Sequence, residues 1–423
     1  GDCAAALGDA AALREQLAAN QKLRALDPPD VETLRRAVAE AAEAQESYAL
    51  ERARRREIGE KLAVLQGNIR VIARCRPPVA CETASGADVC AVSFPAGCDG
   101  DVAVTNDAGL KQRFEYDAVF KPGSTQAEVF EAICPLVQSA FDGFSVCIFA
   151  YGQTGSGKTH TMEGPPDDRG VYFRALRELF HARPPGAAVA VKLSMLEVYN
   201  ETIIDLLAEG GSRPKLEVRQ TGAGHSVPGL TSLDVESLDE VQRLTERGGA
   251  NRSVGGHDLN ARSSRSHLIV ALDVSTTVDG TERRARLNLV DLAGSERLSR
   301  TGATGDRLKE AQNINKSLSA LGDVIAALAK KHAAHVPYRN SKLTFLLQDS
   351  LSRHAKVLMF VNISPAESNA SETICSLAFA SRCRDVALGA ASNKPDAIEL
   401  AKAKQEIRAL KAKLAAAAPA KGR

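Results

Sequence analysis

The sequence predicts an α/β fold, a three-layer sandwich in which a central, mainly β sheet is flanked by helices. Strands and helices alternate from about residue 68 to residue 389, which is the pattern of a domain built around one sheet. Within that range the apolar, strand-forming run 146–151 ends abruptly in a glycine-rich loop. A second apolar run, 287–290, ends in the acidic residue Asp291. These two strand ends are the chemically distinctive parts of the alternation.

Composition narrows the class of protein. The chain has 423 residues, enough for one large domain with appendages or for two or three domains. Its 44% hydrophobic and 25% charged residues are ordinary for a soluble globular protein, and a net charge of +2 gives no reason to expect nucleic acid. No apolar run approaches the ~20 residues that cross a bilayer, so we expect no membrane insertion. Nine cysteines without a CxxC pair indicate reduced thiols in a cytoplasmic protein.

Two helical segments precede the alternating region. Residues 1–27 are rich in alanine, and the prolines that follow interrupt any helix there. Asp30 is the predicted N-cap of a long helix within residues 28–67. A heptad of apolar residues runs through 31–66, but Arg52 and Arg55 fall in its seam, which suits a coiled coil poorly. The segment is either a neck that forms a homodimer or a single solvated helix, and both interpretations remain open.

The elements of the alternating region follow Gly67 in order. Residues 68–76 predict a strand that Pro77 closes, and residues 114–120 predict a second strand. Residues 126–141 carry apolar side chains at helical spacing and predict one amphipathic helix. A further strand is expected at 189–199, before a turn at Asn200.

The loop after the strand 146–151 fits the phosphate-loop pattern G-x-x-x-x-G-K-[ST]. Glycines let its backbone turn tightly and direct N–H groups at an anion. Lys158 can reach the β- and γ-phosphates of a nucleotide, and the Thr159 hydroxyl is placed to bind Mg²⁺. The predicted nucleotide-binding residues of this loop are Gly152, Gln153, Thr154, Gly155, Ser156, Gly157, Lys158 and Thr159.

Two later loops complete a nucleotide site. Asp291 ends a strand and would hold Mg²⁺ through water, while the N–H of Gly294 could sense a γ-phosphate. The hydroxyl-rich loop 260–267 suits closure over Mg²⁺ and the terminal phosphate, and Arg265 could pair with Glu296 when both loops are closed. Each loop alone could be a surface connection. Together, in this order and on strand ends, they predict a P-loop nucleoside triphosphatase.

These segments resemble the nucleotide loops of the kinesin motor domain. The resemblance rests on GQTGSGKTHTMEG at 152–164, NARSSRSH at 260–267 and DLAGSE at 291–296. It extends to RCRP at 74–77, LEVYNE at 196–201, VPGL at 227–230 and NINKSL at 313–318, and so covers about residues 68–389. The guanine-specifying NKxD motif is absent, because Leu318 stands where its acid belongs. The resemblance therefore implies ATP with Mg²⁺.

The resemblance also implies residue roles. Arg74, Arg76, Pro77 and His160 would border the adenine. Thr159 and Ser264 would bind Mg²⁺, with Asp291 behind them. Glu296, together with Ser263 and Arg265, would organise the water that attacks the γ-phosphate.

Positive charge gathers in the last third of this region. Residues 297–356 hold eleven Lys and Arg against four acids, a local charge of +7. A helix inside it has an apolar stripe that should pack on the sheet, at Ala311, Ile314, Leu318, Leu321, Ile325 and Leu328. This leaves Arg307, Lys309, Lys316, Lys330 and Lys331 for solvent or an acidic partner. A solvated face is the ordinary interpretation. The resemblance favours the microtubule instead, although Ser352–Ala355, Ala261 and Thr304 depart from the family pattern.

The order of segments bears on direction of movement. The neck precedes the motor at 68–389, and residues 390–423 predict a C-terminal helix and tail. This arrangement resembles the plant-type kinesin-14 subfamily, which implies an ATP-driven, minus-end-directed motor of the microtubule cytoskeleton. Two alternatives remain: a non-motile microtubule-binding or crosslinking ATPase, and a P-loop ATPase that acts on something other than microtubules.

Overall fold

The structure is a computed structural model that describes residues 69–83, 90–96, 100–106, 108–184, 186–209, 215–221, 224–253, 262–278, 280–297, 305–330, 335–352 and 355–386, with seven helical residues between 33 and 47. The chain divides into two compact units, Gly1–Lys61 and Leu62–Arg423. In the first, Arg36 and Glu40 form an exposed ion pair one helical turn apart, at 3.6 Å. Most of the predicted neck, the tail at 390–423, and Ala261, Thr304 and Lys331 lie outside the described residues.

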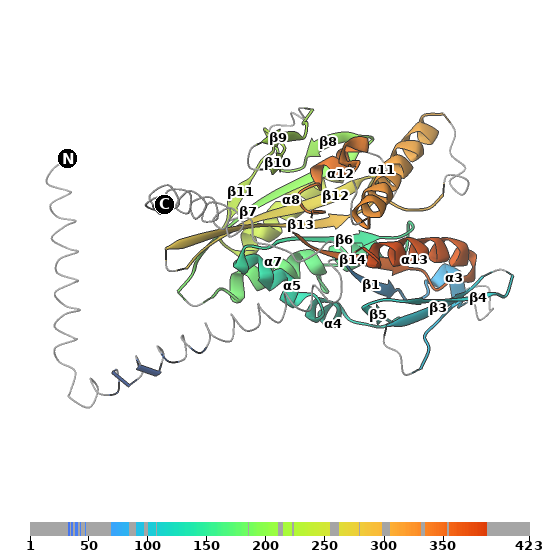
Figure 1. Ribbon diagram of the computed structural model, residues 1–423, viewed down its shortest axis with the longest axis horizontal. Coiled ribbons are helices and arrows are strands. Elements are labelled where there is room, and N and C mark those ends of the chain that lie inside the picture. Colours follow the sequence, from blue (N-terminus) through green and yellow to red (C-terminus); the bar gives the residue numbers. More distant parts are fainter. Residues whose placement is uncertain are drawn as a thin grey trace, which may run out of the picture. The chain divides into compact units, whose positions relative to one another are not determined.

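A mixed sheet forms the centre of the second unit (Figure 1), in the order β11-β7-β12-β13-β6-β14-β1-β5, with β8 on β7. Strands β13, β6, β14, β1 and β5 are parallel neighbours, while β12, β7, β8 and β11 pair antiparallel. Their bounds are β1 Ile69–Cys75, β5 Ala118–Phe120, β6 Ser145–Tyr151, β7 Ala188–Tyr199, β8 Thr202–Asp205, β11 Leu233–Val235, β12 His267–Val278, β13 Thr281–Asp291 and β14 Ala355–Ile363. Because parallel strands end at the same edge, Tyr151 and Asp291 come together there.

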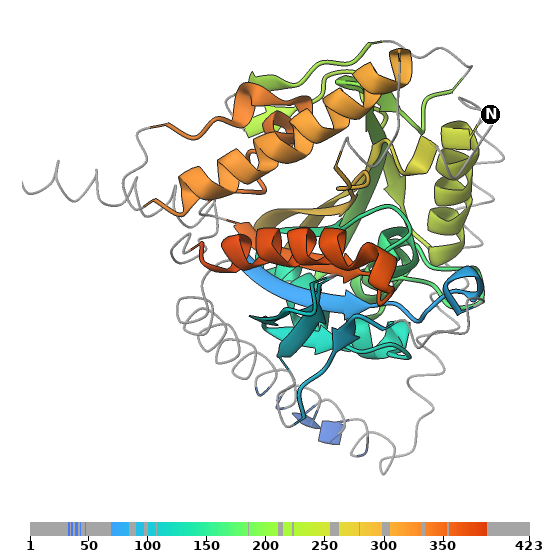
Figure 2. The same ribbon diagram turned by 90° about the vertical axis from the view of Figure 1, so that its right-hand side faces the viewer.

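Helices cover both faces of this sheet, which confirms the predicted three layers. One face carries α11 (Asp306–Leu328), α12 (Lys342–Leu346) and α13 (Ala370–Arg384), seen in orange and red in Figure 2. The other carries α4 (Gln126–Glu131), α5 (Cys134–Gln138), η1 (Ser139–Asp142), α7 (Val171–His181) and α8 (Leu238–Ser253). Both faces of the sheet are apolar, because successive side chains of a strand point to opposite faces. In β6, Cys147 and Phe149 belong to the core on the α11–α13 face, and Ile148 belongs to the core on the other face.

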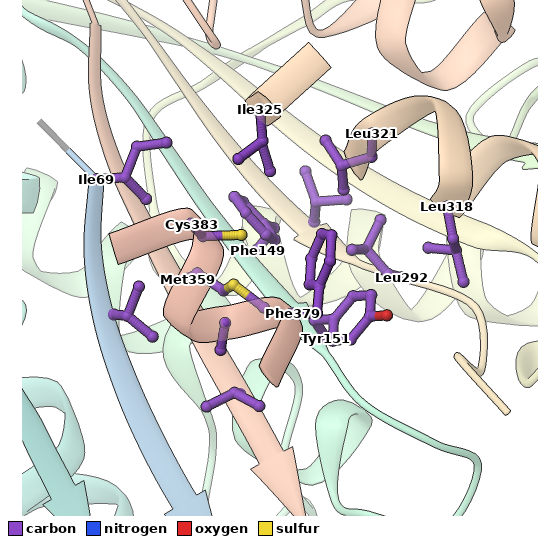
Figure 3. Close-up of a cluster of buried hydrophobic side chains, with 14 of the residues drawn as sticks. Ile69, Phe149, Tyr151, Leu292, Leu318, Leu321, Ile325, Met359, Phe379 and Cys383 are labelled. Atoms are coloured by element: carbon purple, nitrogen blue, oxygen red, sulfur yellow. The ribbon is translucent and has the colours of Figure 1, made fainter. Parts of the chain in front are cut away.

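The apolar stripe of α11 packs as predicted. Leu318, Leu321, Ile325 and Leu328 are buried against the sheet and α13, and Ile314 is partly buried there. Figure 3 shows Leu321 and Ile325 beside Phe149 of β6. Arg307, Lys309, Lys316 and Lys330 are exposed, as expected.

Two predicted elements are each divided. The helix expected at 126–141 is α4, α5 and η1, because Pro135 stands at the start of α5 and cannot continue the helix before it. The strand expected at 114–120 is the end of β4 (Lys111–Glu115) followed by β5, since the Asp117 carboxylate accepts a hydrogen bond from the Val71 N–H at 2.6 Å where the chain enters the central sheet.

The remaining elements lie around this frame. A small antiparallel sheet holds β2 (Val92–Ser93), β3 (Asp101–Thr105) and β4, and β9 (Arg219–Thr221) pairs with β10 (Gly224–Ser226). Short helical turns are α3 (Ala80–Thr83), α6 (Lys158–Met162), η2 (Tyr338–Asn340) and η3 (Glu367–Asn369). Among the described helices, none is long and apolar enough to cross a membrane.

Candidate active site

The phosphate loop joins β6 to α6 in a backbone shape that requires glycine. Gly152, Gly155 and Gly157 have φ angles of 149°, 77° and 96°. At Gly152 there is also no room for a side chain, because a Cβ would lie 2.2 Å from the carbonyl oxygen of Asn362 in β14. The loop therefore keeps its shape only with these glycines.

Lys158 and Thr159 open α6 and face the end of β13. The buried Lys158 ammonium donates to the carbonyl oxygens of Gly152 and Gln153 at 2.9 and 3.0 Å. Burial lowers its pKa, and the Asp291 and Glu296 carboxylates oppose that shift. The Thr159 hydroxyl donates to Asp291 Oδ2 at 2.7 Å.

The oxygen groups at this point fit Mg²⁺. Asp291 is 2% exposed, and its Oδ1 is buried with no hydrogen-bond partner among the described residues. Burial raises the pKa of Asp291, and the Lys158 charge opposes the rise. A buried carboxylate oxygen in need of a partner, with a threonine hydroxyl beside it, is the hard oxygen chemistry that Mg²⁺ prefers.

The 291–296 loop contacts both other loops of the site. The Gly294 N–H donates to the carbonyl oxygen of Ser264 at 2.8 Å, and the Ser295 N–H donates to that of Gly152 at 3.1 Å. The Glu296 carboxylate accepts from the backbone N–H and the hydroxyl of Thr154, at 2.8 and 2.5 Å. The three segments predicted from the sequence therefore meet at one sheet edge.

The predicted ion pair between Arg265 and Glu296 is not formed in this structure. Arg265 pairs instead with Glu310 in the first turns of α11, at 3.0 Å. Glu310 also accepts a hydrogen bond from the Tyr199 hydroxyl at 2.8 Å, which holds its carboxylate for the arginine. Glu310 lies next to the site, and the sequence analysis missed its role, because it was only one of four acids in the basic region 297–356.

A buried acid on β7 fixes the base of the 262–267 loop, and the sequence analysis missed it too. Glu197 is 0% exposed and pairs with Arg252 at 3.2 Å and with Arg262 at 2.7 Å. Arg252 also reaches the carbonyl oxygen of Ser263 at 3.4 Å and the hydroxyl of Ser266 at 3.0 Å. Two arginines on one buried carboxylate satisfy its charge and hold the loop in place. An acid within the apolar run of β7 was the available signal.

His267 links the 291–296 loop to α11. Its Nδ1 accepts the Ala293 N–H at 3.0 Å, so the proton is on Nε2, which lies 2.7 Å from the Ser317 hydroxyl. Ser317 in turn donates to the carbonyl oxygen of Ile314 at 2.7 Å. Burial, with the charges of Arg252 and Lys158, lowers the pKa of His267 to about 3. The imidazole is therefore neutral at pH 7.

The residues expected around adenine differ in their surroundings. Arg74 is buried, and its guanidinium donates to the Gln126 side chain at 2.7 Å and to the Thr161 hydroxyl at 3.0 Å. Arg76 donates to the carbonyl oxygen of Gly155 in the phosphate loop at 2.6 Å. Pro77 and His160 are exposed. Burial and the Arg74 charge lower the pKa of His160.

A glycine-shaped phosphate loop with lysine and threonine, an acid at the end of the neighbouring strand, and two loops that converge on them define a P-loop nucleoside triphosphatase. Within that class, the chain belongs to the kinesin motor domain family, whose model matches residues 74–386.

Curated relatives place the chain near plant kinesin-14 proteins. It is 49% identical to "Kinesin-like protein KIN-14E" of Oryza sativa subsp. japonica over 88% of this chain and 35% of that protein. It is 49% identical to "Kinesin-like protein KIN-14Q" of Arabidopsis thaliana over 84% of this chain and 30% of that protein. The chain thus spans about a third of the length of these relatives.

Solved structures agree with this fold. The "C-terminal motor and motor homology domain of Kar3Vik1 fused to a synthetic heterodimeric coiled coil" has a TM-score of 0.73 and 38% identity, over 88% of this chain and 99% of that one. A second, "KIF14[391-772] dimer two-heads-bound state - AMP-PNP in complex with a microtubule", has a TM-score of 0.69 and 36% identity, over 78% and 96% of the two chains. The chain is a kinesin-14-like motor domain, a P-loop ATPase fold.

Proposed function

We propose that this chain hydrolyses ATP to drive movement along microtubules toward their minus ends. The observation that carries the hydrolytic part is the convergence of the 152–159, 262–267 and 291–296 loops around Asp291, whose Oδ1 is buried without a partner among the described residues. Kinesin family membership and the kinesin-14 relatives support the motor part.

Positioning and charge stabilisation dominate phosphoryl transfer, and this chain has groups for both. Lys158 exchanges its bonds to the Gly152 and Gln153 carbonyls for the β- and γ-phosphates. The Gly294 N–H, which donates to the Ser264 carbonyl in this structure, turns to the γ-phosphate. Thr159 and Ser264, with Asp291 behind them, would hold Mg²⁺, which when bound would neutralise developing charge on the phosphate oxygens.

The attacking water needs an orienting group, and Glu296 supplies it. Thr154 places the Glu296 carboxylate at the rim of the phosphate loop through two hydrogen bonds. Closure of the 262–267 loop brings Ser263 to the water and transfers Arg265 from Glu310 to Glu296. Arg74, Arg76, Pro77 and His160 form the side of the site that takes the adenosine.

Microtubules are the partner, through the basic region 297–356. The exposed cations Arg307, Lys309 and Lys316 lie on α11, which is joined to the ATP site through Glu310 and Ser317. The local charge of +7 over residues 297–356 attracts an acidic polymer, and the attraction weakens with salt. One solved relative is itself described in complex with a microtubule.

Direction and assembly follow from the segments around the motor. We assign residues 1–27 to an alanine-rich helical segment, 28–67 to the neck, 68–389 to the motor and 390–423 to a C-terminal helix and tail. A homodimer through 31–66 would give the neck a partner. The neck precedes the motor, as in minus-end-directed kinesins, so its swing is the mechanical step.

ATP turnover with and without microtubules tests this function. The parent chain should hydrolyse ATP slowly alone and faster with microtubules. Glu296→Ala should retain nucleotide binding but lose about 10²-fold or more of its turnover, which is the size of the loss when one group that stabilises the transition state is removed from a hydrolase. Glu282→Ala, an exposed acid that pairs only locally with Arg284 among the described residues, is the matched control and should keep parental turnover.

Three outcomes would contradict the proposal. Turnover unchanged by microtubules indicates a P-loop ATPase with another partner. Bundling of microtubules without gliding indicates a non-motile crosslinker. Gliding of polarity-marked microtubules that shows movement of the motor toward plus ends contradicts the proposed minus-end direction.

A further inference from the structure

Arg76 is saturated with protein acceptors. A guanidinium has five N–H groups. Nε donates to the Gly155 carbonyl at 2.6 Å, and one terminal nitrogen donates to the Pro77 carbonyl at 2.9 Å and to Glu82 at 2.7 Å. The other donates to the second oxygen of Glu82 and to the Ser364 hydroxyl at 2.9 Å. Each of the five N–H groups thus has a partner, and hydrogen bonding to a nucleotide would break one of these bonds.

Glu82 fixes the direction in which Arg76 points. The two side chains form a forked, two-bond ion pair and are 15% and 12% exposed. The Glu82 carboxylate is itself held, since it accepts from the Val79 N–H at 3.0 Å and from the Ser364 hydroxyl at 3.4 Å. Hydrogen bonding from Arg76 lowers the pKa of Glu82 to about 2, so the pair stays charged at neutral pH. With both terminal nitrogens engaged, Nε can aim only at the phosphate loop.

The Gly155 carbonyl is a sensitive point of that loop. The peptide bond is planar and trans, so its carbonyl and the next N–H point in opposite directions. When Arg76 holds the Gly155 oxygen outward, the Ser156 N–H points into the loop, where it donates to the Gln153 carbonyl at 3.2 Å. Arg76 also lies beside Gly157, since a Cβ added to this glycine would be 3.7 Å from the Cβ of Arg76.

We propose that Glu82 is a positioning residue for nucleotide binding: paired with Arg76, it fixes the 155–156 peptide of the phosphate loop, and the pair acts on the phosphates of any nucleoside rather than on the base. This rests on the proposed ATPase function but changes the expected role of Arg76. A base-reading arginine would keep a free donor, and Arg76 uses all five on the protein.

Nucleotide selectivity separates the two roles. The full 423-residue chain is titrated with fluorescent mant-ADP and mant-GDP in Mg²⁺ buffer, without microtubules. Removing an outer partner that orients a metal ligand costs roughly 10- to 100-fold in affinity, and for Glu82→Gln we expect about tenfold. The loss should be equal for the two nucleotides, so that their affinity ratio stays at the parental value. In steady-state ATPase, KM should rise about tenfold while kcat at saturation changes much less.

Matched variants keep the test interpretable. Glu115→Gln removes the carboxylate of a more exposed ion pair, with Arg384 at 3.0 Å, and should bind both nucleotides as the parent does. Arg76→Lys keeps the charge but loses the fork, and should show the same base-independent loss. Because the pair acts as one unit, the double variant should lose less than the product of the single losses.

Three outcomes overturn the inference. A loss confined to mant-ADP would show that Arg76 reads the base. Affinities within twofold of the parent in both single variants would show that the pair does not position the loop. Multiplicative losses would show that the two residues act separately. The binding titration needs no microtubules, so its result does not depend on whether the chain moves along them.

Discussion

Acidification from pH 7 to pH 5 should destabilise the motor unit through His267. The imidazole is fully enclosed, accepts the Ala293 N–H through Nδ1, and has a pKa of about 3. In the unfolded chain the pKa of histidine returns to about 6.5. The unfolded state therefore binds more protons between these two values, and the contribution of His267 is present above pH 6.5 and lost as pH falls toward 3.

The size of this loss follows from the two pKa values. Proton linkage between pH 7 and pH 5, with pKa values of about 6.5 and about 3, gives about 2 kcal/mol of lost unfolding free energy. The buried Asp291 has a raised pKa, which acts on stability in the opposite direction. The effect of His267 must therefore be read as a difference between parent and variant.

Urea unfolding at pH 7 and pH 5, followed by circular dichroism because the chain has no tryptophan, measures this difference. His267→Gln keeps polar atoms but does not titrate, so the parent should lose about 2 kcal/mol more than the variant between the two pH values. Ser317→Ala retains the imidazole and should keep the pH dependence of the parent, although it is less stable at both. Equal losses in parent and His267→Gln would refute the reasoning.

Three further substitutions test the α11 contacts. Leu321→Ala empties a site that is 1% exposed and should cost about 2–5 kcal/mol in urea unfolding, whereas Leu308→Ala on the same helix, 37% exposed, should stay within about 0.5 kcal/mol of the parent. Glu310→Gln removes the charged partner of Arg265, a contact worth about 1 kcal/mol, and so frees the arginine for Glu296. Turnover without microtubules should then rise about fivefold, and a fall would contradict this.

Local chemistry made the phosphate loop predictable. The glycines at 152, 155 and 157 adopt φ values that other residues avoid, and the loop shape therefore follows from residues next to one another in the chain. Asp291 was predictable for a related reason, because an apolar strand that stops at an acid must end at the sheet edge where its parallel neighbour β6 also ends.

Side-chain partners across long stretches of chain were not predictable. Arg265 pairs with Glu310 in this structure, and sequence alone does not rank Glu296 against Glu310, which is 45 residues away. The five acceptor atoms around Arg76 likewise belong to residues up to 288 positions away from it in the chain. Pro135 marks the division of the helix expected at 126–141, but the apolar periodicity continues across it and led to the prediction of a single helix.

Two contacts between described residues join the ATP site to α11, and together they constrain how the two can move. Arg265 contacts Glu310 and His267 contacts Ser317, and these two α11 residues are seven positions apart, so they lie on one helix face. The same loop receives the Gly294 N–H at its Ser264 carbonyl. One attachment point would let α11 pivot, whereas two fix both its distance from the loop and its rotation. On the proposed mechanism, a γ-phosphate that drew Gly294 away from Ser264 would displace α11 only if one attachment broke, and the partly exposed ion pair would break before the buried histidine contact.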